Sequence, residues 1–348
     1  MKKMLLLILI SLLVGNIYAQ DDEKLQISGS VDTYYKYDFS KYKTEDGSSN
    51  IPTYFANEQN SISLGMINVI AQKKVGKASF VGDLSFGPRG QNASYLSGSI
   101  PNSADGNSFH IQNLYVNYQF TDQFSMTAGY MGTFIGYEII SPTGNFNYST
   151  SYLFSSGPFQ NAGIKANYTF NDKVGLMVGL FNDWNVYQDF NGVSDFGAQL
   201  SLAPVDGWNA YLNFLTGYPS GTIYDLTTSY EMSSGLTLGL NAADYSASNN
   251  DAGGYSGGAL YVQQAFSEVL SLGVRGEYFK GKDVIEDAVN IEGSKILAFT
   301  LSANVHAGPL TLIPEVRFDN NSDAVFFDSS NAATKNASQF SIAAVYAF

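Results

Sequence analysis

The chain has 348 residues, a formal net charge of −13 and no cysteine, and it contains 24 Tyr, 24 Phe and 34 Gly. The lack of cysteine excludes disulfides, thiolate catalysis and zinc–cysteine sites, and the acidic charge argues against nucleic acid, whose binding requires clustered Lys and Arg. Charged residues make up only 14% of the chain, which is low for a soluble enzyme and typical of a protein with a large apolar exterior.

The N-terminus has the composition of a secretory signal peptide. Two lysines follow Met1 and precede an apolar stretch that ends at Val14, and Ala19 stands before a polar junction. The stretch is shorter than the roughly 20 residues that a membrane-spanning helix needs. We therefore expect residues 1–19 to be removed, and residues 20–348 to form a single domain.

From residue 25 onward, apolar and polar residues alternate with a period of two, as they do in strands that have one apolar face. The pattern is clearest at the C-terminus, where Phe340, Ile342 and Tyr346 share a face. The expected strands are 25–39, 61–72, 77–87, 108–120, 122–136, 157–170, 173–184, 195–204, 207–217, 222–231, 234–247, 256–266, 269–281, 295–305, 308–318 and 339–348. The alternation is weak in 61–72 and 256–266, so fourteen, sixteen or eighteen strands are compatible with the sequence.

Short and long connections alternate along these strands. The short ones are 73–76, Thr121, 171–172, 205–206, 232–233, 267–268 and 306–307. The others are mostly long, namely 40–60, 88–107, 137–156, 185–194, 248–255, 282–294 and 319–338, with 218–221 as the exception. This parity is typical of outer-membrane barrels, which have short periplasmic turns and long extracellular loops. The sequence therefore predicts an all-β fold, a transmembrane antiparallel β-barrel of about sixteen strands. The last strand should pair with the first, because hydrocarbon leaves no backbone group unpaired.

In such a barrel the alternate, polar face of each strand points into the lumen. Lys or Arg on the lipid face would cost about 2–4 kcal/mol at the midplane, which fixes the direction of the charged side chains. The predicted pore-lining residues are Asp32, Tyr34, Lys36, Asp38, Asp83, Lys165, Arg275, Glu277, Glu315 and Arg317. They could fill the wall as mutually compensating charges, or they could create a field that selects permeating solutes. The sequence favours neither interpretation.

The expected loop 137–156 is unusually rich in aromatic residues for a solvated segment. We hypothesise that it folds into the lumen or packs over the mouth and narrows the channel. The residues expected to form this constriction are Glu138, Asn145, Phe146, Asn147 and Tyr148. The alternative is an external cap over the rim of the barrel.

Signals for catalysis or metal binding are weak. The chain has only two His residues, and His110 and His306 are expected at opposite rims of the barrel. The acidic stretch 319–323 resembles the start of a calcium loop, but Ala324 and Ser330 replace the Gly and Glu that such a loop requires. We therefore expect no enzyme activity, no cofactor and no metal site.

Several stretches resemble the OmpL-like putative β-barrel porin family. They are Val31-Asp-Thr-Tyr-Tyr-Lys-Tyr-Asp-Phe39, Ile111-Gln-Asn-Leu-Tyr-Val-Asn-Tyr118, Gly129-Tyr-Met-Gly-Thr-Phe-Ile-Gly-Tyr-Glu138, Asn145-Phe-Asn-Tyr-Ser-Thr-Ser-Tyr152 and Pro314-Glu-Val-Arg-Phe-Asp319. The resemblance runs from about residue 25 to the C-terminus. It implies a porin-like protein of the Gram-negative outer membrane, and it brings no established substrate or catalytic residue.

The expected function is passive diffusion of small hydrophilic solutes through a polar lumen of mixed charge, with a mild preference for cations. Two alternatives are kept. One is a closed barrel whose loops act in adhesion or surface binding, and the other is a substrate-specific channel. The expected partners are outer-membrane lipid and small hydrophilic solutes. A homo-trimer is kept as a hypothesis, because sixteen-stranded porins are commonly trimers.

Overall fold

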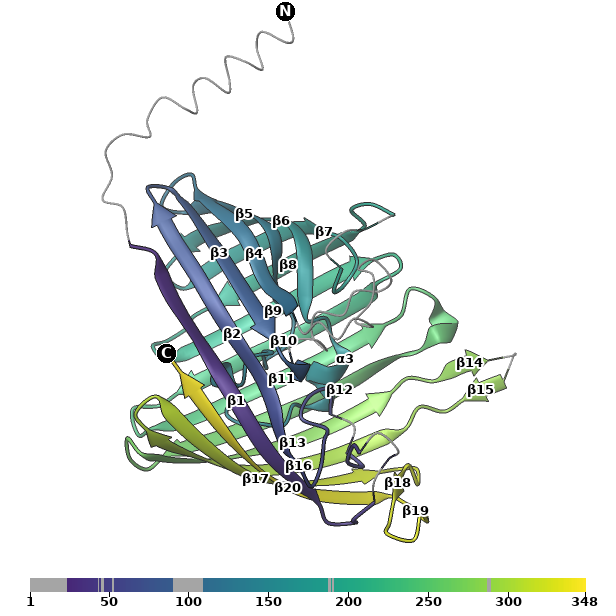
Figure 1. The fold of residues 1–348 in the computed structure, drawn as a ribbon. Helices are drawn as coiled ribbons and strands as arrows, with labels where there is room; N and C mark the ends of the chain where they lie inside the picture. Colours follow the sequence, from purple (N-terminus) through teal and green to yellow (C-terminus); the bar gives the residue numbers. More distant parts are fainter. Residues whose placement is uncertain are drawn as a thin grey trace, which may run out of the picture.

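The computed structural model describes residues 24–42, 44, 47–51, 53–89, 109–186, 189, 191–286 and 289–348. The expected signal peptide lies outside these residues. Sixteen strands form one closed antiparallel barrel (Figure 1), which confirms the predicted fold. In barrel order they are β1 (Gln26–Asp38), β2 (Ile62–Val75), β3 (Ala78–Phe86), β4 (Phe109–Gln119), β5 (Phe124–Gly132), β6 (Gln160–Asn171), β7 (Val174–Phe181), β8 (Asp195–Leu202), β9 (Trp208–Gly217), β10 (Gly221–Glu231), β11 (Leu236–Ser246), β12 (Gly254–Ala265), β13 (Leu270–Gly281), β16 (Lys295–Ala307), β17 (Leu310–Asn321) and β20 (Asn336–Ala347).

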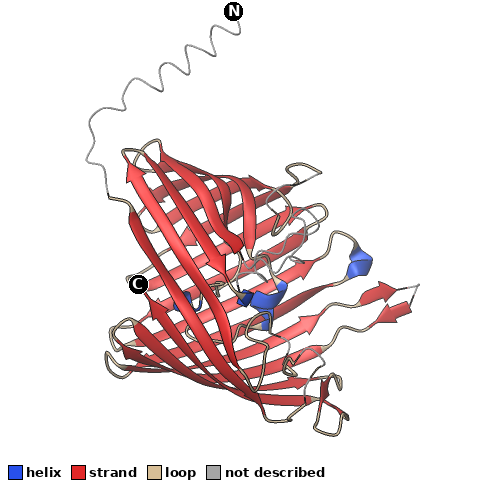
Figure 2. Cartoon of the chain, in the orientation of Figure 1, coloured by secondary structure: helices blue, strands red, loops and turns tan. Residues whose placement is uncertain are grey.

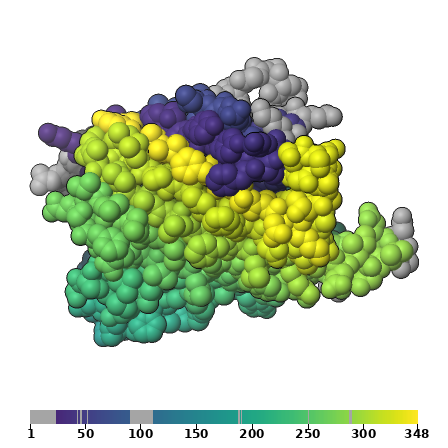
Figure 3. All heavy atoms as spheres, turned by 90° about the horizontal axis from the view of Figure 1, so that it is seen from below, coloured from purple at the N-terminus to yellow at the C-terminus, as the bar shows by residue number. Residues whose placement is uncertain are grey.

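The barrel closes between its first and last strands. β1 pairs with β20 from Ser30↔Ala347 to Asp38↔Gln339. Beyond this ladder, Gly29 and Phe348 exchange two backbone hydrogen bonds of 3.0 Å. In the space-filling view the purple N-terminal strand lies directly beside the yellow C-terminal one (Figure 3). Among the described residues, the sheet that forms the barrel has no unpaired edge strand, which satisfies the requirement that hydrocarbon places on the backbone.

Short turns and long loops occupy opposite ends of the barrel, as predicted. The start of β1 and the C-terminus both lie at the short-turn end (Figure 1). Two long loops contain small hairpins, β14 (Val284–Glu286) with β15 (Val289–Ile291) and β18 (Phe326–Phe327) with β19 (Ala333–Thr334). Within the described residues, no helix is both long and apolar enough to cross a membrane.

The two faces of the wall follow the predicted alternation, and β16 shows it most clearly. Leu297, Phe299 and Leu301 point outward and are 59%, 48% and 46% exposed. Between them, Thr300 and Ser302 point inward and are buried. Apolar side chains gain by facing lipid, whereas hydroxyls need hydrogen-bond partners inside the barrel.

Several predicted strands are shorter in the structure, and the strand predicted over 122–136 is shortened most. The sequence predicts a strand over 122–136, but β5 ends at Gly132 and the chain then turns into the barrel. The connection to β6 contains a 3-10 turn, η2 (Pro142–Gly144), and a short helix, α3 (Tyr152–Ser156). The helix α3 lies within the outline of the barrel in Figure 2. Such short helical turns leave no periodic signal in the sequence. A third turn, η3 (Asn250–Ala252), lies in the β11–β12 loop.

Candidate functional site

The most prominent internal feature is the connection between β5 and β6, residues 133–159, which we call the lumen loop. It leaves the wall at β5, contacts β13, β16 and β17 across the barrel, and also contacts β1, which is four strands from β5. Its central part is buried, from Asn147 to Leu153. The hypothesised constriction segment therefore lies inside the barrel and does not form an external cap.

Glu138 links the start of the lumen loop to the wall and to the loop's own centre. Its carboxylate accepts hydrogen bonds from Arg275 Nη1 on β13 at 2.6 Å and from Tyr261 Oη on β12 at 3.1 Å. It also accepts one from the backbone N–H of Ser151 at 2.7 Å. A carboxylate with three donors, one of them charged, is well satisfied despite its burial.

Two further wall carboxylates bind backbone N–H groups of the loop. Glu315 on β17 accepts from the amides of Tyr148 and Ser149 at 2.9 and 3.1 Å. Glu277 on β13 accepts from the amides of Tyr152 and Leu153 at 3.0 and 2.8 Å. The second pair belongs to the first turn of α3, whose amides have no partner within the helix. The wall thus supplies the acceptors that the loop backbone lacks.

Two wall arginines bind loop carbonyl groups next to these amides. Arg275 and Arg317 donate to the carbonyl oxygens of Ser149 and Thr150, each at 2.7 Å. Arg317 also makes a forked contact with Asp319 through Nε and Nη2, at 2.8 and 3.0 Å. The loop backbone therefore rests on an alternating row of wall carboxylates and guanidinium groups. The planar guanidinium group of Arg can donate several hydrogen bonds at once, so Arg317 binds Thr150 and Asp319 together.

The first strand holds the lumen loop and the β1–β2 loop. Asp32 accepts from Tyr148 Oη at 2.6 Å and from the Met66 amide at 2.9 Å. Burial, the largest cause, raises the pKa of the Tyr148 hydroxyl well above its usual range, so the group remains a donor. Lys36 donates to Ser49 at 3.0 Å, and Asp38 accepts from the Ser40 and Asn50 amides. Tyr34 donates to Glu58 and packs against Tyr148.

Two predicted pore-lining residues lie on the wall away from these anchors. Asp83 on β3 is buried and accepts from Asn68 and Asn113 at 3.3 and 3.1 Å. Lys165 on β6 is partly exposed and makes no hydrogen bond or ion pair within the described residues. The ten predicted residues thus divide into two groups. Eight of the residues, on β1, β13 and β17, bind the loops. Asp83 and Lys165 face a different sector of the lumen.

Of the other predicted constriction residues, Asn147 reaches the wall and donates to Ser302 at 2.7 Å. Asn145 shapes the loop itself, because its amide group bonds the N–H and the carbonyl of Ile139 at 2.9 and 2.6 Å. Phe146 packs directly on Gly273 of β13, where a Cβ atom would collide with its ring.

Two other wall glycines accommodate the lumen loop in the same way. A Cβ atom on Gly197 would collide with the ring of Phe134, and one on Gly239 would collide with the hydroxyl of Tyr137. The missing side chains allow aromatic groups to lie against the strand backbone. Glycine residues of the wall thus help to dock the lumen loop.

Sequence reasoning missed Asp319 and Arg89. Asp319 continues the inward alternation of Glu315 and Arg317, one residue beyond the predicted end of its strand, so a longer strand would have included it. Arg89 is buried, stacks 4.7 Å from the Phe55 ring centroid and 4.9 Å from that of Tyr148, and donates to Ile140 O at 3.1 Å. It joins three loops, and no local pattern marks it.

Near the long-loop end, part of the barrel interior is apolar. Ile135 and Leu153 of the lumen loop form a buried cluster with Phe181, Leu215 and Ile223 from β7, β9 and β10. These wall residues lie near the ends of their strands at the long-loop end of the barrel. The lumen loop is therefore held by polar contacts on one side and by apolar packing on the other.

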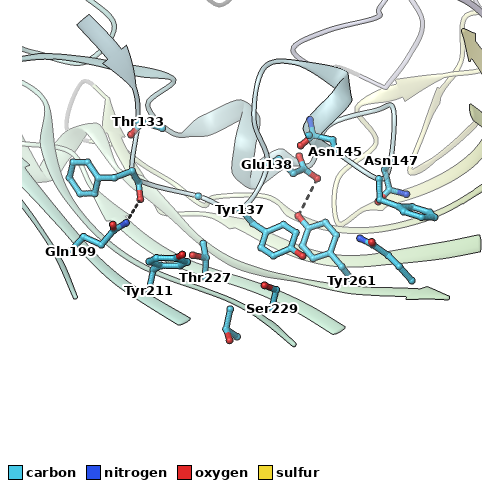
Figure 4. A pocket seen from close by; sticks show the side chains of 16 residues that line it. Thr133, Tyr137, Glu138, Asn145, Asn147, Gln199, Tyr211, Thr227, Ser229 and Tyr261 are labelled. Carbon is cyan, nitrogen blue, oxygen red and sulfur yellow. Dashed lines mark hydrogen bonds between the residues drawn. The ribbon is translucent and has the colours of Figure 1, made fainter. Parts of the chain in front are cut away.

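Toward the short-turn end, the loop leaves a cavity of about 530 Å³ against β8–β12 (Figure 4). Tyr211, Thr227, Ser229 and Tyr261 from the wall, and Tyr137 from the loop, line it. A second cavity, of about 280 Å³, is also lined by Gln199 and Tyr211 and extends to the turn residues Asp172, Lys173 and Ala203. The two cavities adjoin and lead toward the short-turn end. The described residues contain no cluster of three or more His, Cys, Asp or Glu side chains suited to a metal ion.

A comparison with family models decides the family. Residues 24–348 match the model described as "Putative beta-barrel porin-2, OmpL-like". The chain belongs to this family. A comparison with curated proteins gives no match. The protein is therefore a porin-like outer-membrane barrel. Porins are typically not enzymes.

Solved structures share the fold of this OmpL-like barrel at low sequence identity. OmpF of Salmonella typhi, in complex with daunomycin, is 10% identical with a TM-score of 0.60, and the match covers 94% of this chain and 100% of that one. The anion-selective porin of Comamonas acidovorans is 12% identical with a TM-score of 0.58, over 93% and 99%. A trimer form of OmpT from Vibrio cholerae is 13% identical with a TM-score of 0.56, over 94% and 100%. These similarities concern the fold alone.

Proposed function

We infer that this OmpL-like barrel is a channel for passive diffusion of small hydrophilic solutes, and that the lumen loop is its constriction. The observation that carries this proposal is the position of the loop. It crosses the lumen and is bound to the far wall by Arg275, Glu277, Glu315 and Arg317. A loop held in this way narrows the lumen without blocking the sector behind it.

The proposed path follows the sector of the wall from β2 to β9. Its inward side chains include Asn117, Lys165, Asn167 and Gln199, which are polar and partly exposed. The smaller cavity lies along this sector, and the larger one, against β8–β12, adjoins it at Gln199 and Tyr211. Hydrated solutes need a polar wall, because polar groups of the wall must replace the hydrogen bonds to water that a solute loses when it enters. In this proposal Asp83 and Lys165 face the solute, while the other predicted pore-lining residues position loops.

The buried charges support a mild preference for cations. Among the described residues the buried acidic side chains are Asp32, Asp38, Asp83, Glu138, Asp195, Asp225, Glu277, Glu315 and Asp319. The buried basic ones are Lys36, Arg89, Arg275 and Arg317. An excess of negative charge around a narrow lumen raises the local concentration of cations.

Planar-bilayer recording of the purified protein tests the proposal. Stepwise conductance increases on insertion are expected from a diffusion channel. A protein that inserts but gives no steps with the native sequence or with the lumen loop shortened would refute it. Correct insertion can be checked independently by the heat-dependent gel mobility that folded barrels show.

A closed barrel with surface-binding loops is the second candidate, and the loop packing favours it. Ile51 of the β1–β2 loop packs with Phe326 of β18 and Ala337 of β20, and Phe55 packs against Phe154 and Phe159 of the lumen loop. Such packing would keep the long-loop end shut. Silence of the native protein, with conductance only after loop shortening, would support this candidate.

We also propose a homo-trimer, in line with the trimer form of the similar OmpT structure. Chemical cross-linking of the protein in detergent, followed by electrophoresis, should show a band of three protomers. A monomer band alone, under conditions that keep the barrel folded, would contradict it.

A further inference from the structure

We propose that the cavity between the lumen loop and strands β8–β12 is a binding site for a neutral sugar of mono- or disaccharide size. The proposal rests on the channel function above and names the class of solute that the channel would retain. It follows from the chemistry of the groups that face the cavity.

The cavity is formed by inward positions of neighbouring strands. Tyr211 on β9 is the direct ladder partner of Thr227 on β10. Ser229 on β10 pairs with Gly239 on β11, which in turn pairs with Tyr261 on β12. Because Gly239 has no side chain, Tyr137 of the lumen loop reaches the wall at this position, and its ring lies beside that of Tyr261 (Figure 4).

The polar groups in this cavity are neutral and available. The hydroxyls of Tyr137, Tyr211, Thr227 and Ser229, and the amide of Gln263, line it and make no hydrogen bond within the described part of the chain. Each hydroxyl can donate and accept, and the amide supplies both functions as well. A ligand with several hydroxyl groups complements such a set, because it too both donates and accepts.

The charges near the cavity are already neutralised. Glu138 lines it, but its carboxylate is occupied by Arg275, Tyr261 and the Ser151 amide. A charged solute entering the cavity would lose water without gaining an unpaired counter-charge, which costs free energy. The site therefore favours a neutral ligand over an amino acid or an organic acid.

The aromatic groups favour a sugar over a nucleoside. Tyr137 and Tyr261 are stacked on each other, with ring centroids 4.4 Å apart and planes 20° from parallel. No slot for a flat base remains between them. Tyr211 is 37% exposed, and its ring offers an apolar surface to the cavity that it lines. A volume of about 530 Å³ falls within the range of small-molecule sites, about 300–1,000 Å³.

The test uses the full-length protein and two independent measurements. In planar bilayers, glucose and maltose are titrated against the open-channel current. In detergent, binding of the same sugars is measured by titration calorimetry, with uridine and glutamate as comparison solutes.

The variants Thr227→Val and Gln263→Leu each remove hydrogen-bonding groups while keeping a similar size. Gln264→Leu and Thr222→Val are the matched controls, because they change the opposite face of the same strands.

We expect sugar binding in the native protein, and a dissociation constant raised about threefold to tenfold in Thr227→Val and Gln263→Leu. The control variants should bind as the native protein does. Stronger binding of uridine or glutamate, absence of sugar binding, or equal loss in test and control variants would overturn the proposal. Conductance without sugar binding would refute only the sugar site. Sugar binding without conductance would refute the channel and leave the site standing.

Discussion

Arg275 on β13 and Glu138 of the lumen loop are 137 residues apart in the chain, yet their side chains meet at 2.6 Å with exposures of only 1% and 5%. An ion pair buried in this way depends on both partners. Removal of one partner leaves an uncompensated buried charge, which lowers the free energy of unfolding by about 3–5 kcal/mol. This pair therefore joins the lumen loop to the wall.

Glu138→Ala should loosen the lumen loop and leave the barrel intact, because the strand ladders do not depend on this side chain. We expect larger and noisier single-channel currents, with the heat-dependent gel mobility unchanged. The double variant Glu138→Leu/Arg275→Met removes both charges and should restore a quieter channel. Identical currents in the native protein and the single variant would show that the pair does not hold the constriction.

Deletion of residues 141–152 should raise single-channel conductance, because it removes the part of the loop bound to Glu315, Glu277 and Arg317. The strands β5 and β6 pair directly from Phe124↔Tyr168 to Gly132↔Gln160, so the wall should remain closed. Conductance equal to that of the native protein would reject the constriction role.

Gly273→Val should displace Phe146 and with it the lumen loop, because a Cβ atom at this position collides with the ring. Gly276→Val is the matched control on the same strand, since no atom lies within 4 Å of a Cβ atom built there. We expect increased conductance, and faster protease cleavage of the loop, only in Gly273→Val. The same behaviour in both variants would indicate a general loss of strand stability.

Asp83→Asn and Lys165→Gln should shift ion selectivity in opposite directions. Both residues lie on the wall sector proposed for permeation, and neither forms an ion pair within the described residues. The loss of the carboxylate should weaken the preference for cations, and the loss of the ammonium group should strengthen it. Reversal potentials in a salt gradient measure both effects. Anion selectivity of the native protein would contradict the proposed preference.

Export should remove residues 1–19, because the lysines, the apolar stretch and Ala19 have the arrangement that signal peptidase recognises. N-terminal sequencing or intact mass of the protein from outer membranes should show a chain that begins at Gln20. A mass that includes the first nineteen residues would contradict this expectation.

The sequence alone determined the fold class of this protein and which side chains of the wall face outward or inward, whereas the structure decided among fourteen, sixteen and eighteen strands. An alternation of period two places Leu297, Phe299 and Leu301 outside and Thr300 and Ser302 inside, and lipid penalises any other arrangement. The parity of short and long connections then fixes the direction of each strand. These properties are local, since each depends on residues two positions apart or on a single turn, and a single sequence displays them directly.

The tertiary structure decided what lies inside the wall. Glu315 reads locally as a pore-lining charge, but it binds amides of Tyr148 and Ser149 that are 167 and 166 residues away. Nothing in the sequence indicates that Gly273 contacts Phe146. The two residues meet only because the lumen loop crosses the lumen. Contacts of this kind depend on closure of the barrel, which brings distant strands around a common interior. No periodic pattern in the sequence predicts these contacts, because the two partners lie far apart in the chain.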